Sequence, residues 1–267
     1  MIREIVEGCK NIIGKIGIIV LGIIVFYGVK NNEIGGFMLL IIFFVLIVLS
    51  FYLMDKNYRK SVYYKLTKNN FFAVKFNKGR NGEYLTSRII EKHALQSHRQ
   101  LLNVYVPKRN SDELTEIDLL FIDRTGLYVI ESKNYSGWIF GNETQQQWTQ
   151  TMPNKKKYKF FNPIRQNATH IRAIQDFLEL PIEAIHSVIV FSERCTLKKV
   201  AVTSQNVHII KRENLRRFIQ TQKQTARQLF SQDDIQAIYN KLVPQMQVSD
   251  EVKKQHIQMI QQKYGEK

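Results

Sequence analysis

Residues 116–133, EIDLLFIDRTGLYVIESK, hold two apolar runs separated by the turn sequence Asp-Arg-Thr-Gly, and this stretch decides the fold. Apolar runs bounded by turn residues predict two strands joined as a β-hairpin. If the loop holds only two residues, Asp118 and Glu131 become direct cross-strand neighbours, with Cβ atoms about 5 Å apart. A three-residue loop with Gly126 in a bulge would shift this register by one residue.

Two neighbouring carboxylates in an apolar hairpin are costly unless a cation neutralises them. Lys133 follows Glu131 by two residues, so both side chains lie on one face of the strand, but one ammonium leaves one negative charge over. Alternatively, these charged residues simply lie at a strand end that is exposed to solvent.

A divalent cation would remove the excess negative charge, because Mg²⁺ binds one or two carboxylates together with waters and a substrate phosphate. Asp118 and Glu131, with the carbonyl of Ser132, fit this need. Lys133 could position an attacking water or stabilise charge on a pentacovalent phosphorus. The pattern predicts a phosphodiesterase site that uses Mg²⁺ or Mn²⁺.

The segments around the hairpin predict an α/β domain, in which helices flank a mixed sheet. Asn81 and Gly82 are expected to cap a helix over residues 83–95. Asn162 and Pro163 mark the start of another helix, since Asn is a favoured N-cap and Pro a favoured first helical residue. Further strands are expected over residues 101–107, 136–142, 146–151, 186–192 and 206–210, and further helices from residue 214 onward.

Composition limits the classes of function. The chain has 267 residues, 44% of them apolar, which excludes a disordered protein. Its net charge of +16 points to a phosphate-bearing partner, either nucleic acid or an anionic membrane surface. Cys9 and Cys195 are its two cysteines, so a disulfide framework or a cysteine-based zinc finger is excluded, and the six histidines are scattered without zinc-ligand spacing.

The N-terminal part predicts a membrane anchor. Residues 34–54 carry no charge over 21 residues, which is enough to cross a bilayer as a helix. Residues 16–29 form a shorter apolar run that spans only if it is extended back to residue 12. A signal peptide is the alternative, but no small-residue cleavage pattern follows. We therefore expect a transmembrane helical hairpin over residues 12–54.

Flanking charges predict the orientation of this hairpin. Cations precede the first span and follow the second, whereas the turn between them is neutral. Both chain ends are therefore expected in the cytoplasm, with the protein in the inner membrane of a bacterial cell. Almost all the excess positive charge lies after residue 54. A basic, aromatic connector over residues 55–78 either follows the membrane surface or leads into the domain.

A family resemblance follows from several motifs in order. The chain resembles the NERD (nuclease-related) domain of the PD-(D/E)XK nuclease superfamily, over residues 79–218, with residues 219–267 as a helical extension. Ile117 stands where the superfamily name has proline. The residues that carry the resemblance are Gly82-Glu83, Glu116-Ile117-Asp118, Ile130-Glu131-Ser132-Lys133, Asn134-Tyr135-Ser136-Gly137, Trp148 and Asn162-Pro163-Ile164-Arg165-Gln166-Asn167.

The resemblance implies a restriction-endonuclease-like fold and roles for single residues. It implies that Asp118 and Glu131 bind the metal, that Lys133 is the catalytic lysine and that Glu83 is an additional acid near the metal. It also implies that Gln166 lies beside the site. Two of these roles have plain alternatives, since Glu83 could simply favour the positive end of its helix, and Gln166 could be a surface group.

Lys155, Lys156 and Lys157 are expected in a solvated loop that could contact a DNA backbone. Trp138 and Trp148 are expected to pack in the core or on strands rather than to stack on bases. Two functions follow. The first is a membrane-anchored, metal-dependent endonuclease acting on DNA, with incoming foreign DNA as its natural substrate. The second is a membrane-tethered nucleic-acid-binding module that does not cut.

Overall fold

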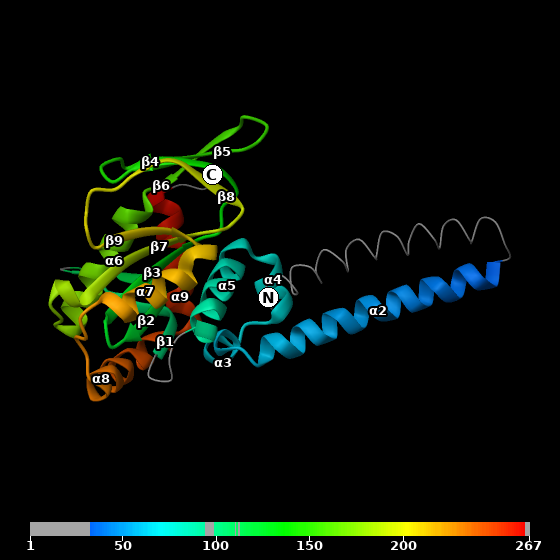
Figure 1. The fold of residues 1–267 in the computed structure, drawn as a ribbon, viewed down its shortest axis with the longest axis horizontal. Helices are drawn as coiled ribbons and strands as arrows, with labels where there is room; N and C mark the ends of the chain where they lie inside the picture. Colours follow the sequence, from blue (N-terminus) through cyan, green and yellow to red (C-terminus); the bar gives the residue numbers. More distant parts are fainter. Residues whose placement is uncertain (1–32, 94–98, 110, 112, 265–267) are drawn as a thin grey trace. The chain divides into compact units, whose positions relative to one another are not determined.

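The computed structural model describes residues 33–93, 99–109, 111 and 113–264. The chain divides into two compact units, Met1–Lys60 and Ser61–Lys267. The first unit contains helix α2 (Glu33–Arg59), drawn in blue in Figure 1. Its residues Met38–Arg59 are long and apolar enough to cross a membrane, and the most apolar 18 residues of that stretch have no buried side chain. The helix predicted over residues 34–54 is thus confirmed, whereas the span predicted over residues 12–29 lies outside the described residues.

The second unit is built on two sheets (Figure 1). The five-stranded sheet has the order β1-β2-β3-β7-β9, in which β1, β2 and β3 are antiparallel and β7 and β9 run parallel to β3. The four-stranded sheet has the order β6-β5-β4-β8. The strands of the first sheet are β1 (Arg99–Pro107), β2 (Leu114–Asp123), β3 (Gly126–Lys133), β7 (Ile185–Phe191) and β9 (Val207–Lys211). Those of the second are β4 (Gly137–Asn142), β5 (Gln147–Thr151), β6 (Lys157–Phe161) and β8 (Cys195–Ala201).

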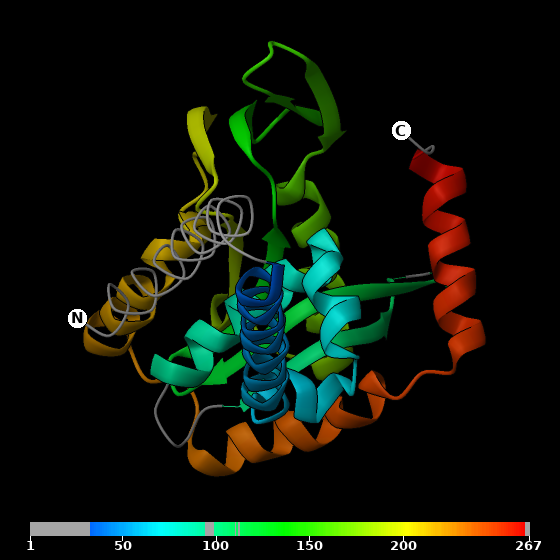
Figure 2. The ribbon, with the colours of Figure 1, turned by 90° about the vertical axis from the view of Figure 1, so that its right-hand side faces the viewer.

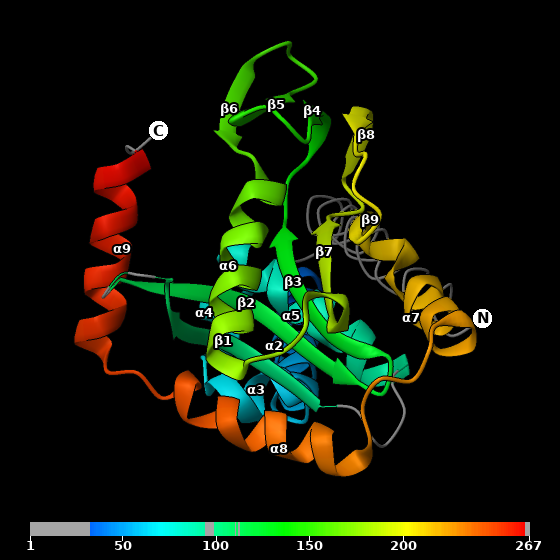
Figure 3. The ribbon, with the colours of Figure 1, turned by 90° about the vertical axis from the view of Figure 1, so that its left-hand side faces the viewer.

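Helices cover both faces of the five-stranded sheet. The helix α6 (Pro163–Leu178) and the helix α8 (Gln232–Leu242) pack on one face, where Val129, Ile174 and Ile238 belong to the same buried core. On the other face lies α5 (Lys78–His93), and α7 (Leu215–Thr225) packs beside it. The short helices α3 (Val62–Thr67) and α4 (Phe71–Phe76) contact α5, so the connector leads into the domain. Helix α9 (Asp250–Tyr264) stands on the side of the domain opposite α7 and β8 (Figures 2 and 3).

The central hairpin has the register that places the two carboxylates side by side. Asp123 pairs with Gly126 and Leu119 with Ile130, so two residues form the loop. The ladder ends at Leu119 and Ile130, and the next residues along the two strands are Asp118 and Glu131. Gly126 has a φ of +138°, and a Cβ there would lie 2.8 Å from the Ala184 carbonyl, so glycine is required at this turn.

Two predictions about the elements need correction. Helix α5 begins at Lys78 rather than residue 83, because the Asn77 side chain accepts a hydrogen bond from the Arg80 amide and caps the helix earlier. The loop predicted around Lys157 is partly strand β6, and β8 was not predicted. The predicted C-terminal extension does contain the helices α8 and α9, and Ile235 and Leu242 of α8 are in the main core.

Candidate active site

The candidate site lies at the C-terminal end of β3. The half-buried Asp118 on β2 accepts a hydrogen bond from the backbone amide of Ser132, with 2.9 Å between Oδ2 and N. Glu131 on β3 is buried. The predicted neighbouring carboxylates are therefore brought together by the hairpin register and held by a backbone contact.

Lys133 and Gln166 complete the group at this strand end. The Lys133 Nζ lies 2.6 Å from Glu131 Oε1 and donates to Gln166 Oε1 at 3.0 Å. Gln166 lies near the start of α6, where Asn162 is the N-cap residue. The Asn162 side chain accepts a hydrogen bond from the Ile164 amide and donates to backbone carbonyls of Asn142 and Gln145. Sequence-distant residues thus surround the end of β3.

His170 belongs to the site and was not predicted. Its Nε2 lies 3.2 Å from Glu131 Oε2, and its Nδ1 lies 2.8 Å from the hydroxyl of Thr115. A carboxylate can only accept, so the Nε2 of His170 donates the hydrogen bond to Glu131. The sequence does hold a clue to His170, because it follows Gln166 by four residues and so lies on the same helix face.

Glu83 and Glu116 form a second pair of acidic residues beside the site, linked by Asn103. The Glu83 Oε2 accepts from the Tyr63 hydroxyl at 3.3 Å and from the Asn103 side-chain amide at 3.4 Å. The same amide donates to Glu116 at 3.3 Å. Asn103 has a left-handed φ of 51° within β1, opposite Asp118, a conformation that Asn tolerates better than most residues. Sequence reasoning missed Asn103, which interrupts an otherwise apolar strand.

The pKa shifts show an excess of negative charge. Burial raises the pKa of Asp118 well above its usual range, and the charges of Glu131 and Glu83 raise it further. Burial by itself would raise the pKa of Glu131, but Lys133 and His170 outweigh it and lower that pKa to about 2. Burial disfavours the Lys133 ammonium, yet Glu131 raises its pKa above the ordinary value, so Lys133 is charged at neutral pH.

The donor set fits a hard divalent cation. In the part of the chain that the structure describes, no three His, Cys, Asp or Glu side chains form a metal-binding group. Two adjacent carboxylates remain, and Mg²⁺ commonly takes one or two, filling its other positions with water and phosphate oxygens. The raised pKa of Asp118 marks where added positive charge would be stabilised. Asp118 and Glu131 thus fit a metal, whereas Glu83 is held by Tyr63 and Asn103 and its role as a ligand stays a prediction.

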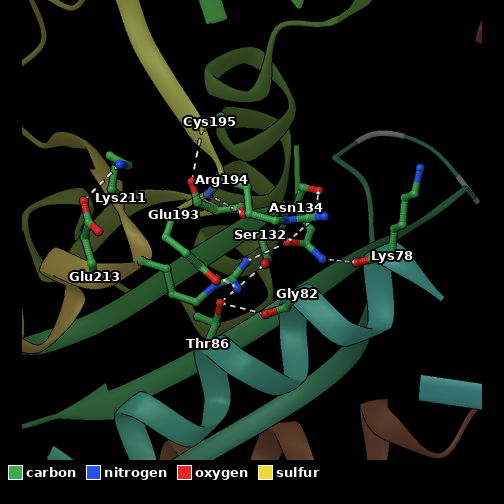
Figure 4. A network of polar contacts seen from close by, with 12 residues as sticks. Lys78, Gly82, Thr86, Ser132, Asn134, Glu193, Arg194, Cys195, Lys211 and Glu213 are labelled. Carbon is green, nitrogen blue, oxygen red and sulfur yellow. Dashed lines mark hydrogen bonds and ion pairs between the residues drawn. The ribbon is translucent and has the colours of Figure 1, made fainter. Parts of the chain in front are cut away.

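A polar network fixes the chain after Lys133 (Figure 4). Asn134 donates to the Lys78 carbonyl at 2.7 Å and accepts from Arg194 and the buried Arg212. It joins the start of α5 to the segments after β7 and β9. Gly82 allows this approach, because a Cβ there would lie 2.8 Å from Asn134 Cβ.

The predicted surface residues lie on the four-stranded sheet. Lys155, Lys156 and Lys157 are exposed at the β5–β6 turn. Both tryptophans lie on strands, as predicted: Trp148 on β5 is fully buried, whereas Trp138 on β4 is 44% exposed.

The architecture is that of a restriction-endonuclease-like α/β domain, with the acids and lysine at the end of the central hairpin. Residues 78–192 match the NERD, nuclease-related domain. The chain is also 35% identical over 188 residues to an uncharacterized protein of Bacillus anthracis, a match that covers 70% of this chain and 86% of the relative. The protein belongs to the NERD family. No solved structure matches the chain.

Proposed function

We propose that this protein is a metal-dependent endonuclease that hydrolyses phosphodiester bonds in DNA and is anchored to a membrane by its N-terminal segment. The proposal rests on one observation: Asp118 and Glu131 are adjacent at the strand end where Lys133 and Gln166 converge. Membership of a nuclease-related family supports the reaction class.

Asp118 and Glu131, with the Ser132 carbonyl, would hold Mg²⁺ or Mn²⁺. When bound, such an ion polarises the phosphate and lowers the pKa of a bound water. His170 orients Glu131, and Asn103 holds Glu83 beside the site. The charge of Glu131 raises the pKa of Lys133, which favours its ammonium form. This ammonium would bind a phosphate oxygen and stabilise the charge that develops there, while Gln166 positions it.

The remaining parts of the proposal concern substrate and location. The exposed Lys155, Lys156 and Lys157 would contact the DNA backbone. The apolar helix α2, with cations in its last turn, would keep the domain at an anionic cytoplasmic membrane face. DNA entering the cell is the substrate class that such a location favours.

The runner-up is a tethered module that binds nucleic acid without cutting it. One observation favours it: both Glu131 oxygens already have partners, Lys133 and His170, so this carboxylate is neutralised within the chain. A binder, however, has no physical reason to keep Asp118 and Glu131 in front of a phosphate ligand.

Cleavage assays separate the two functions. The full chain in detergent micelles should cut DNA with Mg²⁺ or Mn²⁺ and should stop when EDTA is added. Asp118→Asn and Glu131→Gln should abolish cutting through loss of metal binding, and Lys133→Met should lower turnover by about 100- to 1,000-fold with metal affinity kept. Asp233→Asn, an exposed acid on α8, is the matched control. Cutting that persists in all three site variants would exclude the proposed function.

A further inference from the structure

The outer face of the four-stranded sheet has an unusual composition. Directly paired residues of a sheet point to the same side, and two rows can be followed across β4, β5 and β6. Trp138 pairs with Thr151, which pairs with Lys157; Phe140 pairs with Thr149, which pairs with Lys159. On β8, Lys199 pairs with Phe140. Thr151 is buried. We call the rest of this surface the outer face, and it consists of Trp138, Phe140, Thr149, Lys157, Lys159, Lys198 and Lys199.

The opposite side of the same sheet is ordinary core. Ile139 and Trp148 are fully buried there, and Trp148 stacks on Phe191 of the five-stranded sheet with ring centroids 6.1 Å apart. One side of the sheet therefore packs in the core and stabilises the fold. The residues on its other side are not needed for this packing and are free to bind a ligand.

The outer face is positively charged. The four strands contain four lysines, all of them exposed, and no aspartate or glutamate. Two of these lysines are on β6 and two on β8, the edge strands of the sheet, so positive charge lies at both edges of the outer face. A polyanion with closely spaced phosphates complements such a face.

An aromatic side chain lies among these lysines. Trp138 is 44% exposed, and the Lys198 ammonium lies 5.6 Å from the centre of its ring. The outer face also borders an open hollow of about 730 Å³, which is lined in part by Phe140, Lys159 and Lys199. Exposed indole with adjacent ammonium groups is the combination that stacks an unpaired base and holds its phosphates.

The outer face adjoins the candidate active site. Strand β4 starts four residues after Lys133, and Asn162 connects β6 to α6, which carries Gln166. Figure 3 shows the four-stranded sheet standing beyond the ends of β3 and α6. A strand lying along this sheet would lead to the acidic group.

We propose that the outer face binds a single-stranded stretch of nucleic acid, with one base stacked on Trp138 and its phosphates held by the four lysines. The inference rests on the proposed nuclease function and deepens it, because it assigns unpaired strands, rather than intact duplex, as the substrate class. Single-stranded DNA and RNA share this chemistry.

Binding in EDTA tests the proposal apart from cutting. Fluorescence anisotropy of the full chain in detergent micelles would use labelled single strands of about 15 nucleotides, DNA and RNA, and a duplex of equal length. Trp138→Ala should weaken single-strand binding about tenfold and leave duplex binding unchanged, and Trp138→Phe should keep most of the affinity. Equal affinities of Trp138→Ala and the parent chain for single strands would overturn the proposal.

The lysines are tested through salt dependence. Lys198→Gln combined with Lys199→Gln should reduce the slope of log affinity against log salt by about 1.4, since each single-strand phosphate contact contributes about 0.7. Lys92→Gln with Lys254→Gln removes the same charge from exposed positions elsewhere and should leave the slope unchanged. Equal slopes in both double variants would overturn the outer face as the binding site.

The two proposals fail separately. Trp138-dependent binding without cutting in Mg²⁺ would support the outer face and exclude the nuclease. Equal cutting of a single-stranded substrate, at concentrations below saturation, by Trp138→Ala and by the parent chain would exclude the outer face and leave the nuclease in place.

Discussion

At the residue scale, the candidate site combines several carboxylates with one ammonium. Burial, opposed by the hydrogen bond from Asn103 and reinforced by the charge of Glu116, raises the pKa of Glu83 to about 7. The folded protein therefore holds a proton that the unfolded chain releases near pH 4.5. The stabilising contribution of this proton is fully present below pH 4.5 and is lost as the pH rises through about 7.

This shift predicts how stability depends on pH. In EDTA, the free energy of unfolding of the full chain should fall by at most about 3 kcal/mol between pH 4.5 and about 7 because of Glu83. Glu83→Gln should remove that part of the dependence. Urea titrations in detergent at a series of pH values measure it. If the free energy of unfolding depends on pH in the same way in the parent chain and in Glu83→Gln, the assignment to Glu83 is wrong.

His170 is expected to act through Glu131. Because its ring holds one oxygen of Glu131 and is itself fixed by Thr115, His170→Ala should let the carboxylate rotate and weaken Mn²⁺ binding about 10- to 100-fold. Isothermal titration calorimetry measures this affinity. His208→Ala, on β9, is the control and should bind Mn²⁺ like the parent chain. An unchanged affinity in His170→Ala would remove its positioning role.

At the element scale, the close packing of α5 against the end of β3 positions the loop that follows Lys133. Gly82 faces Ser132 and Asn134, and a Cβ would lie 3.2 Å from the Ser132 hydroxyl as well as 2.8 Å from Asn134 Cβ. At Gly79, on the same helix, a Cβ would meet only the Asn77 side chain, at 3.4 Å. The two glycines therefore respond differently to the same substitution.

Gly82→Ala should destabilise the protein by about 1–3 kcal/mol, because helix and strand must move apart. It should also reduce cutting, since Asn134 links α5 to the segment after Lys133. Gly79→Ala should be neutral or stabilising by up to about 1 kcal/mol, since Ala is favoured over Gly in helices. Thermal unfolding of the two variants compares them directly. A Gly82→Ala protein as stable as Gly79→Ala would contradict this account of the packing.

At the scale of the whole molecule, the proposed location depends on residues 12–54. Helix α2 is long and apolar enough to span a membrane, and basic residues follow its apolar stretch. If the two predicted spans form a hairpin, the domain faces the cytoplasm, where anionic lipids attract its basic residues.

A reporter fused after Lys267 tests this topology. The hairpin predicts green fluorescence and no alkaline phosphatase activity, because both chain ends are cytoplasmic. If the fusion shows alkaline phosphatase activity and no green fluorescence, the chain crosses the membrane once and the domain lies outside the cytoplasm. A cytoplasmic role against incoming DNA would then be excluded.

Local pattern accounts for much of the fold. Apolar runs and turn residues predicted β1, β2, β3 and β7, and Asn162 with Pro163 predicted the start of α6. The two-residue turn set the register of Asp118 and Glu131 because side chains alternate strictly along paired strands. The strands β6 and β8 were missed because each carries two lysines, which interrupt its apolar residues.

The sequence by itself determined the central hairpin, the alternation that aligns Glu131 with Lys133 and the apolar helix α2, because each depends on neighbours within about twenty residues. Only the tertiary structure decided that His170 and Gln166 meet Glu131 and Lys133, that Asn103 joins Glu83 to Glu116 and that Trp138 is exposed among lysines. These contacts join residues distant in sequence. Their geometry is set by how helices and sheets pack together, which local periodicity does not encode.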